Sequence, residues 1–135
     1  MLTLTIEQMK RTLVFIFMIN MIIGCSKEKI AGQSGPEICL SNSSQQNFKN
    51  VVVNTGTGEV TFGDLDAGKK TAYKKFTKAY SYAFVKLEID GQAYTIQPID
   101  FVGETPLKDG RYAYQISVNG TPGQYSNLSL KLIDE

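Results

Sequence analysis

Residues 83–97 carry the pattern that most constrains the fold of this chain. Val85, Leu87 and Ile89 alternate with charged residues, and the dipeptide Asp90-Gly91 follows directly. Strict alternation of apolar and polar residues is typical of a β-strand with one buried face. An Asp-Gly pair favours a type I′ turn, which needs positive φ at both central residues. The segment is therefore predicted to be a β-hairpin whose apolar face lies in a core.

The chain after residue 37 has β character throughout. Short runs rich in Val, Ile, Thr, Tyr and Phe alternate with clusters of Gly, Asn and Asp, and no ten-residue segment has helical apolar spacing. The three adjacent valines Val51 to Val53 predict a strand that is buried on both faces and lies inside a sheet. Besides the hairpin, strands are expected at 38–40, 48–55, 59–62, 71–76, 111–118 and 125–133. Seven or eight short strands at this spacing predict an all-β fold, an antiparallel β-sandwich.

Residues 98–108 are expected to cross between the two sheets and to lead into a short motif. Leu107, Gly110 and Tyr112 form the sequence L-x-x-G-x-Y. This motif resembles the start of a strand in Ig-like and transthyretin-like sandwiches, where a glycine turn precedes a strand whose tyrosine packs near a sheet corner. The resemblance implies an Ig-like or transthyretin-like architecture and carries no information on function.

A basic and then apolar segment precedes the β region. Lys10 and Arg11 are followed by 13 uncharged residues, Thr12 to Gly24, and then by Cys25. This order is typical of a secretory signal peptide with a helical apolar region. Spanning a bilayer takes roughly 20 apolar residues, and Lys27 prevents the run from being extended. A cleaved signal is therefore favoured over a retained transmembrane helix.

The sequence Ile22-Ile23-Gly24-Cys25 resembles the lipobox of bacterial lipoproteins. In that family the cysteine sulfur receives a diacylglyceryl group, a dedicated signal peptidase cuts before it, and the new amine usually receives a fatty acid such as palmitate. The resemblance implies that Cys25 is the first residue of the mature protein and its membrane anchor. Ser26 follows where an aspartate tends to retain the protein at the inner membrane, so the outer membrane is the expected location.

The chain is thus expected to have three parts. Residues 1–24 are the signal peptide, with Met9 as the expected true start, and residues 38–135 are the sandwich domain. Between them, residues 25–37 combine the lipidated cysteine with a polar segment that contains glycine and proline and has no periodicity. A flexible tether of this length reaches roughly 20 Å.

Composition narrows the possible functions. Removal of residues 1–24 takes away Lys10, Arg11 and Glu7 and leaves 12 basic and 12 acidic residues, and this neutrality argues against a nucleic-acid partner. The chain has no histidine, which excludes Ser-His-Asp and Cys-His catalysis and nearly all of the usual zinc sites. Once Cys25 is lipidated, Cys39 has no partner for an internal disulfide, and it is expected to be a small buried hydrophobe.

Acidic residues give two weak patterns. Asp64 and Asp66 resemble the start of a calcium loop, but lysines occupy the sixth and twelfth positions, where an EF-hand needs glycine and glutamate. Asp100, Glu104 and Asp109 lie in or beside the long connection and are the carboxylates considered for a hydrolase, which needs two such groups across a cleft. All five are expected to be turn or loop charges, and no metal or cofactor is predicted.

One cluster suggests binding. Five lysines within ten residues interleave with aromatic residues, and cations beside aromatic faces can hold a polyanion or a sugar chain. Lysines on an exposed edge strand also prevent aggregation between sheets, which is the competing interpretation. The residues are Lys69, Lys70, Tyr73, Lys74, Lys75, Phe76, Lys78, Tyr80 and Tyr82.

These observations predict a lipid-anchored lipoprotein of the bacterial cell envelope with one β-sandwich domain. Its expected role is that of a non-enzymatic binding or structural module, with an envelope polysaccharide or a protein as partner. The alternative is a small inhibitor or accessory subunit that docks on a larger envelope protein through a sheet edge. A carboxylate-based hydrolase is a third and weaker interpretation.

Replacing the anchor cysteine tests the localisation. A single acyl chain binds a membrane with an association constant of only about 10⁴ M⁻¹, so stable anchoring needs the two or three chains expected on Cys25. Cys25→Ala is expected to release the protein from the membrane fraction or to leave it as an unprocessed precursor. Mass spectrometry that finds an unmodified Cys25 in the mature wild-type protein would contradict the prediction.

Overall fold

The computed structural model describes residues 34–98, 100–120 and 128–135, and these residues contain strands and no helix. The predicted signal peptide, its helix, Cys25 and most of the tether lie outside the described residues. The eight strands are β1 (Glu37–Asn42), β2 (Phe48–Asn54), β3 (Glu59–Leu65), β4 (Lys74–Lys75), β5 (Phe84–Ile89), β6 (Gln92–Ile96), β7 (Arg111–Val118) and β8 (Leu128–Asp134).

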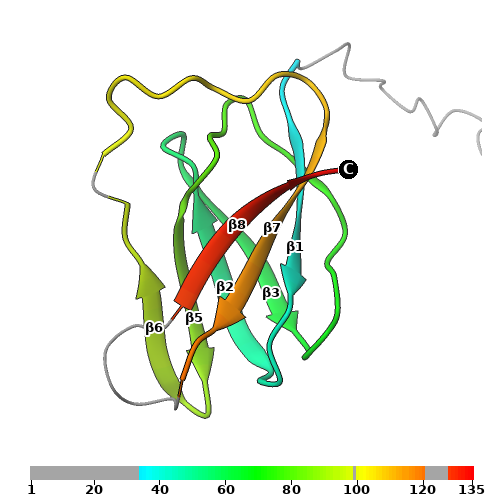
Figure 1. The fold of residues 1–135 in the computed structure, drawn as a ribbon, viewed down its shortest axis with the longest axis vertical. Coiled ribbons are helices and arrows are strands. Elements are labelled where there is room, and N and C mark those ends of the chain that lie inside the picture. Colours follow the sequence, from blue (N-terminus) through cyan, green and yellow to red (C-terminus); the bar gives the residue numbers. More distant parts are fainter. Residues whose placement is uncertain (1–33, 99, 121–127) are drawn as a thin grey trace, which may run out of the picture. The chain divides into compact units, whose positions relative to one another are not determined.

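The strands form two four-stranded sheets, which confirms the predicted β-sandwich. The order is β4-β1-β7-β8 in one sheet and β3-β2-β5-β6 in the other. In Figure 1, β1, β7 and β8 lie in front of β2, β3, β5 and β6. The connection from β6 to β7 passes from one sheet to the other, as predicted. Side chains from both sheets meet in one apolar core, which includes Leu40, Phe48, Val53, Leu87, Tyr114 and Ile116.

The predicted hairpin is present as β5 and β6. Asp90 and Gly91 have φ of 50° and 77°, as a type I′ turn requires. Val85, Leu87 and Ile89 are buried and Lys86 is exposed, although Glu88 is half-buried. The pleat therefore has the predicted register.

Three predictions about the strands need correction. β1 pairs with β7 in parallel, so the sandwich is only mostly antiparallel; the long stretch of chain between these two strands allows the crossover that a parallel pair needs. Val52 is half-buried, because one face of β2 points away from the core, although β2 does lie inside its sheet. The strand expected at 71–76 shrinks to the two residues of β4.

The shortening of β4 has a visible cause. The amide of Leu40 donates to the side-chain oxygen of Thr71 (2.9 Å) instead of to a backbone carbonyl. The ladder between this segment and β1 is therefore interrupted: it pairs at Lys74 and Lys75, and again only as an isolated bridge between Lys70 and Ser41. The chain before β1 is also fixed, since Phe76 donates its amide to the carbonyl of Pro36 (2.9 Å). Residues 35–37, expected to be tether, thus pack on the domain.

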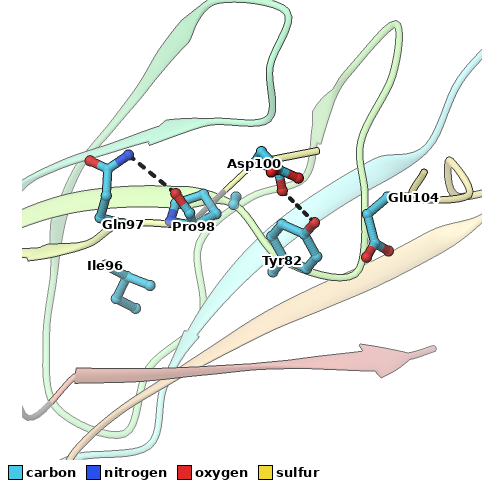
Figure 2. Close-up of a pocket in the computed structure, with 7 residues that line it drawn as sticks. Tyr82, Ile96, Gln97, Pro98, Asp100 and Glu104 are labelled. Atoms are coloured by element: carbon cyan, nitrogen blue, oxygen red, sulfur yellow. Dashed lines mark hydrogen bonds between the residues drawn. The ribbon is translucent and has the colours of Figure 1, made fainter. Parts of the chain in front are cut away.

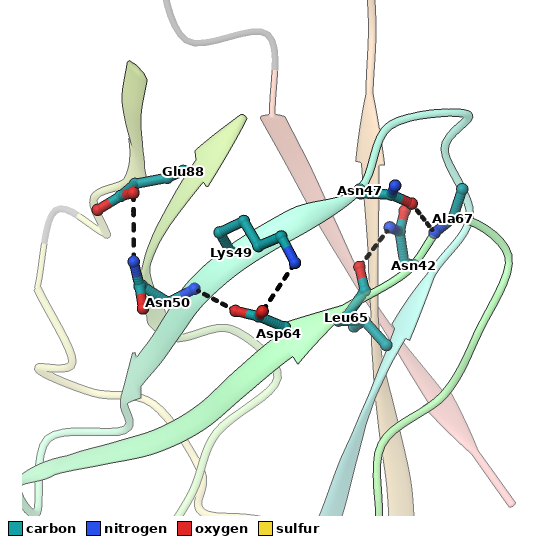
Figure 3. Close-up of polar contacts among 8 residues, drawn as sticks. All are labelled: Asn42, Asn47, Lys49, Asn50, Asp64, Leu65, Ala67 and Glu88. Atoms are coloured by element: carbon teal, nitrogen blue, oxygen red, sulfur yellow. Dashed lines mark hydrogen bonds and ion pairs between the residues drawn. The ribbon is translucent and has the colours of Figure 1, made fainter. Parts of the chain in front are cut away.

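Two polar contacts lie at the end of the sandwich where β1 and β3 end (Figure 3). Asn42 is buried at the end of β1, and its amide nitrogen donates to the carbonyls of Gln46 (2.7 Å) and Leu65 (3.1 Å). Leu65 ends β3, so this side chain joins the two sheets. Asp64, considered above as a calcium ligand, instead accepts from the ammonium of Lys49 at 2.7 Å.

The L-x-x-G-x-Y motif forms a compact corner. The hydroxyl of Tyr112 donates to the carbonyl of Lys108 (3.3 Å), four residues upstream. A Cβ at Gly110 would lie 3.4 Å from the Tyr112 ring, so the ring rests against the glycine backbone. A strand-initial tyrosine bonded to the upstream backbone is the arrangement called a tyrosine corner in β-sandwiches.

The register of the hairpin predicts the effect of two neighbouring substitutions. Leu87→Ala should lower the free energy of unfolding by about 2–5 kcal/mol, because it leaves a cavity in the core. Lys86→Ala, one residue away on the exposed face, should change it by less than about 0.5 kcal/mol. Chemical denaturation measures both, and similar losses from the two variants would contradict the register.

Candidate ligand-binding site

The connection between β4 and β5 contributes side chains to the core at one end of the sandwich. Phe76, Ala79 and Ala83 are buried within it, while Lys75 and Lys78 are exposed. The segment 76–83 thus presents an apolar side to the core without forming a helix or a strand. Its position depends on hydrogen bonds from other parts of the chain.

Three consecutive carbonyls of this segment each accept a hydrogen bond. The carbonyl of Lys78 accepts from the hydroxyl of Thr55 (2.8 Å), at the end of β2. That of Ala79 accepts from the amide of Leu107 (2.8 Å), in the connection from β6 to β7. That of Tyr80 accepts from the hydroxyl of Tyr114 (2.6 Å), on β7. Both sheets and the connection between them therefore hold the same three residues.

These hydrogen bonds are strong constraints because two of the donors are inside the protein. Thr55 and Tyr114 are both fully buried. A buried polar group without a partner costs about 1–3 kcal/mol, so any displacement of the segment would leave several groups unpaired. Tyr80 is the last of these three residues and Tyr82 follows two positions later, so both rings extend from a backbone that is held in place.

The two tyrosines enclose a phenylalanine from the connection between β6 and β7. The centroid of the Phe101 ring lies 5.0 Å from that of Tyr80 and 5.3 Å from that of Tyr82. The interplanar angles are 24° and 8°, so the three rings form a nearly parallel stack. Offset stacks of this kind add stability beyond the burial of their area. The stack is a rigid aromatic wall at this end of the sandwich.

A hollow of about 480 Å³ opens beside Tyr82. Figure 2 shows Tyr82 between Asp100 and Glu104, with its hydroxyl donating to the carbonyl of Asp100 (2.7 Å). The carboxylate of Asp100 accepts from the amide of Val102 (3.1 Å), which fixes the local turn. The hollow is lined by Tyr82, Ala83, Ile96, Gln97, Pro98, Asp100 and Glu104.

A second hollow of about 390 Å³ adjoins the first. Gln97, Pro98 and Asp100 line both hollows and therefore lie between them. The second hollow is also lined by Asn54, Gly56, Glu59, Phe84 and Phe101. We refer to the two together as the end hollows.

The end hollows are acidic. Glu59, Asp100 and Glu104 line them, and none of the lysines and arginines that the structure describes does. Burial, together with the neighbouring Glu104 carboxylate, raises the pKa of Tyr82. At neutral pH the Tyr82 ring is therefore an uncharged aromatic surface beside the carboxyl groups of Asp100 and Glu104.

The structure divides the predicted lysine–aromatic cluster. Tyr80 and Tyr82 stack on Phe101, and of the two tyrosines Tyr82 lines an end hollow. Lys74 reaches across to β3, where its ammonium donates to the carbonyl of Thr61 (2.6 Å) and lies 5.2 Å from the centroid of the Phe62 ring. This lysine thus closes the side of the sandwich. Phe76 is buried, while Lys69, Lys75 and Lys78 are exposed.

The remaining two members, Lys70 and Tyr73, lie on the outer face of the other sheet. Both bond to the carboxylate of Glu135, and the guanidinium of Arg111 lies 5.0 Å from the centroid of the Tyr73 ring. Cys39 is buried, as predicted, and burial raises the pKa of its thiol. An un-ionised buried thiol is a poor nucleophile, so Cys39 is not a candidate for chemistry.

The carboxylates considered for a hydrolase also separate. Asp100 and Glu104 line the first hollow, while Asp109 lies outside both end hollows. Within the described part of the chain, no group of three or more His, Cys, Asp or Glu side chains could hold a metal ion. Sequence reasoning missed Phe101 and Gln97, because single residues in a connection carry no periodic signal, and Glu59, because the first residue of a strand carries none either.

Comparison with known proteins extends the description of the fold. No protein-family model matches this chain, and no curated protein sequence matches it. A solved structure, the NMR structure of a protein from Eubacterium rectale, is similar with a TM-score of 0.50 and 19% sequence identity. The match covers 82% of this chain and 94% of that one, and at this identity it concerns the fold alone. No helix long and apolar enough to cross a bilayer occurs among the described residues.

The buried hydroxyl of Tyr114 predicts a response to alkaline pH. Burial raises the pKa of Tyr114, so its contribution to stability is fully present below the unfolded value of about 10 and is lost as pH rises toward the folded value. The free energy of unfolding should therefore fall as the pH rises above about 10. In Tyr114→Phe this fall should be smaller.

At about pH 8, Tyr114→Phe should already be less stable by about 1–3 kcal/mol, because the Tyr80 carbonyl loses its partner. Urea denaturation across the pH range measures both effects. Tyr112→Phe, which removes an exposed hydroxyl, is the control and should keep the alkaline fall. If Tyr114→Phe matched the wild type at every pH, the buried hydrogen bond would be absent.

Proposed function

We propose that this chain is a lipid-anchored lipoprotein of the bacterial cell envelope whose β-sandwich binds a saccharide in the end hollows, without catalysis. The observation that carries the proposal is the wall formed by Tyr82, backed by Phe101, beside a hollow of about 480 Å³. Concave sites with an aromatic wall and a few polar groups are typical of ligand binding. The lipobox resemblance at Cys25 supports the anchoring, and the outer membrane is the proposed location.

A saccharide fits the chemistry of this site. Sugar rings have apolar C–H faces that pack on aromatic rings, and hydroxyl groups that donate to carboxylates and bond to amides. The first hollow offers the Tyr82 ring together with the Gln97 amide and the carboxylates of Asp100 and Glu104. Hydrogen bonds to ionised carboxylates are the stronger kind. Residues from two segments that are distant in the sequence thus line one ligand-sized space.

The arrangement favours a sugar over a polyanion. The exposed lysines Lys69, Lys75 and Lys78 do not line the end hollows, whereas carboxylates do. A polyanion placed against Tyr82 would be repelled by Asp100 and Glu104. Non-enzymatic binding is proposed because the chain has no histidine and the described residues show no metal cluster.

Loss of the Tyr82 ring tests the proposal. Tyr82→Ala should weaken binding of the full chain to envelope polysaccharide by at least roughly tenfold, or about 1.4 kcal/mol, because the stacking face is gone. Tyr82→Phe keeps the ring and should retain most of the affinity. Affinity electrophoresis or calorimetry, with thermal unfolding to verify the fold, gives the comparison.

Lysine variants supply the opposite control. Lys69→Ala and Lys75→Ala should leave saccharide binding unchanged, since both side chains are exposed and outside the end hollows. If these variants abolished a salt-sensitive interaction while Tyr82→Ala retained it, the exposed lysines would be the binding site. That result would contradict the proposal.

A further inference from the structure

The carboxylates of the end hollows, like several other acidic groups of the domain, have no basic partner among the described residues. Elsewhere in the described residues, Asp64, Glu37 and Glu135 each form an ion pair with a lysine or arginine. Among the described residues, Glu59, Glu104 and Asp100 form no ion pair. The carboxylate of Asp100 accepts a hydrogen bond from the backbone amide of Val102. The acidic charge at the end hollows is therefore not neutralised by the described part of the domain.

Uncompensated negative charge selects the charge of a ligand. Carboxylates that converge on a partly enclosed space attract cations and repel anions, because the protein wall strengthens the field relative to bulk water. Within the described ranges of the chain, no basic side chain lines either hollow to offset this field. A neutral sugar would be accepted, whereas a cationic one would gain an additional electrostatic attraction.

The aromatic wall adds to the same preference. An ammonium group within about 6 Å of a tyrosine ring centroid is attracted by the ring face. Figure 2 shows Tyr82 with Asp100 on one side and Glu104 on the other, so a single cation beside this ring would meet both kinds of partner. Its three N–H donors match the carboxylate oxygens and the Gln97 side-chain oxygen.

We propose that the ligand of the end hollows is an amino sugar with a free, protonated amine, held between the Tyr82 ring and the carboxylates of Asp100 and Glu104. This inference rests on the proposed saccharide binding and adds the chemical class of the sugar. N-acetylation of the amine removes its positive charge, so the same sugar in acetylated form lacks the feature that the site selects.

A matched pair of ligands tests the inference. A tetramer of β-1,4-linked glucosamine and its fully N-acetylated counterpart are titrated into the full chain in detergent by calorimetry. The measurement is made at about pH 6, which lies above the ordinary pKa range of carboxyl groups and below that of amino groups. The free amine should bind at least roughly tenfold more tightly, and added salt should reduce the difference.

Carboxylate variants assign the preference to residues. Glu104→Gln and Asp100→Asn keep the shape of the hollow and the acceptor for the Val102 amide, but each removes a charge, and each should reduce the preference for the free amine several-fold. Asp109→Asn removes an equivalent charge outside the end hollows and should leave the preference unchanged.

The outcomes separate the two proposals. Equal affinity for the two tetramers overturns the amino-sugar inference and leaves saccharide binding supported. A preference that persists in both carboxylate variants, or that is lost in Asp109→Asn, also overturns it. Binding of neither tetramer, together with no effect of Tyr82→Ala on polysaccharide binding, overturns the proposed function as well.

Discussion

The carbonyls of residues 78, 79 and 80 are the point on which the site depends. Each accepts a hydrogen bond from a different part of the chain, and the donors are Thr55, Leu107 and Tyr114. Buried polar groups must be paired or pay a large desolvation cost, so this irregular segment is fixed about as firmly as a strand. Because Tyr80 and Tyr82 lie within or beside it, the aromatic wall is fixed as well.

A second polar contact, at the carboxyl end of β1, also joins the two sheets. Asn42 joins the end of β1 to the end of β3 through the Leu65 carbonyl, and its side-chain oxygen accepts from the amide of Ser44 (2.9 Å). Between these two ends the sheets are held by apolar packing, which has little directional preference. Hydrogen bonds are directional, so these polar contacts fix the orientation of one sheet relative to the other and thereby the shape of the end hollows.

The sequence predicts the parts of this fold that depend on local pattern. Alternation identified the hairpin of β5 and β6, and the run from Arg111 to Val118 matches β7 to the residue. The sequence pattern did not predict strand pairings that depend on residues distant in the chain. The hydroxyl of Thr71 interrupts the pairing of β4 with β1, and β1 pairs in parallel with β7. The same limit applies to the site, where Tyr82 was identified as a candidate but Phe101, its stacking partner, was not.

The amide hydrogen exchange of Leu107 tests the central claim most directly. This amide lies in a long connection outside any strand, yet the structure pairs it with the Ala79 carbonyl at 2.8 Å. The account predicts that it exchanges only through global unfolding, at a rate close to those of the core amides of β5 and β7. Exchange at the fast rate of an exposed loop would mean that the segment is not pinned and that the aromatic wall has no fixed support.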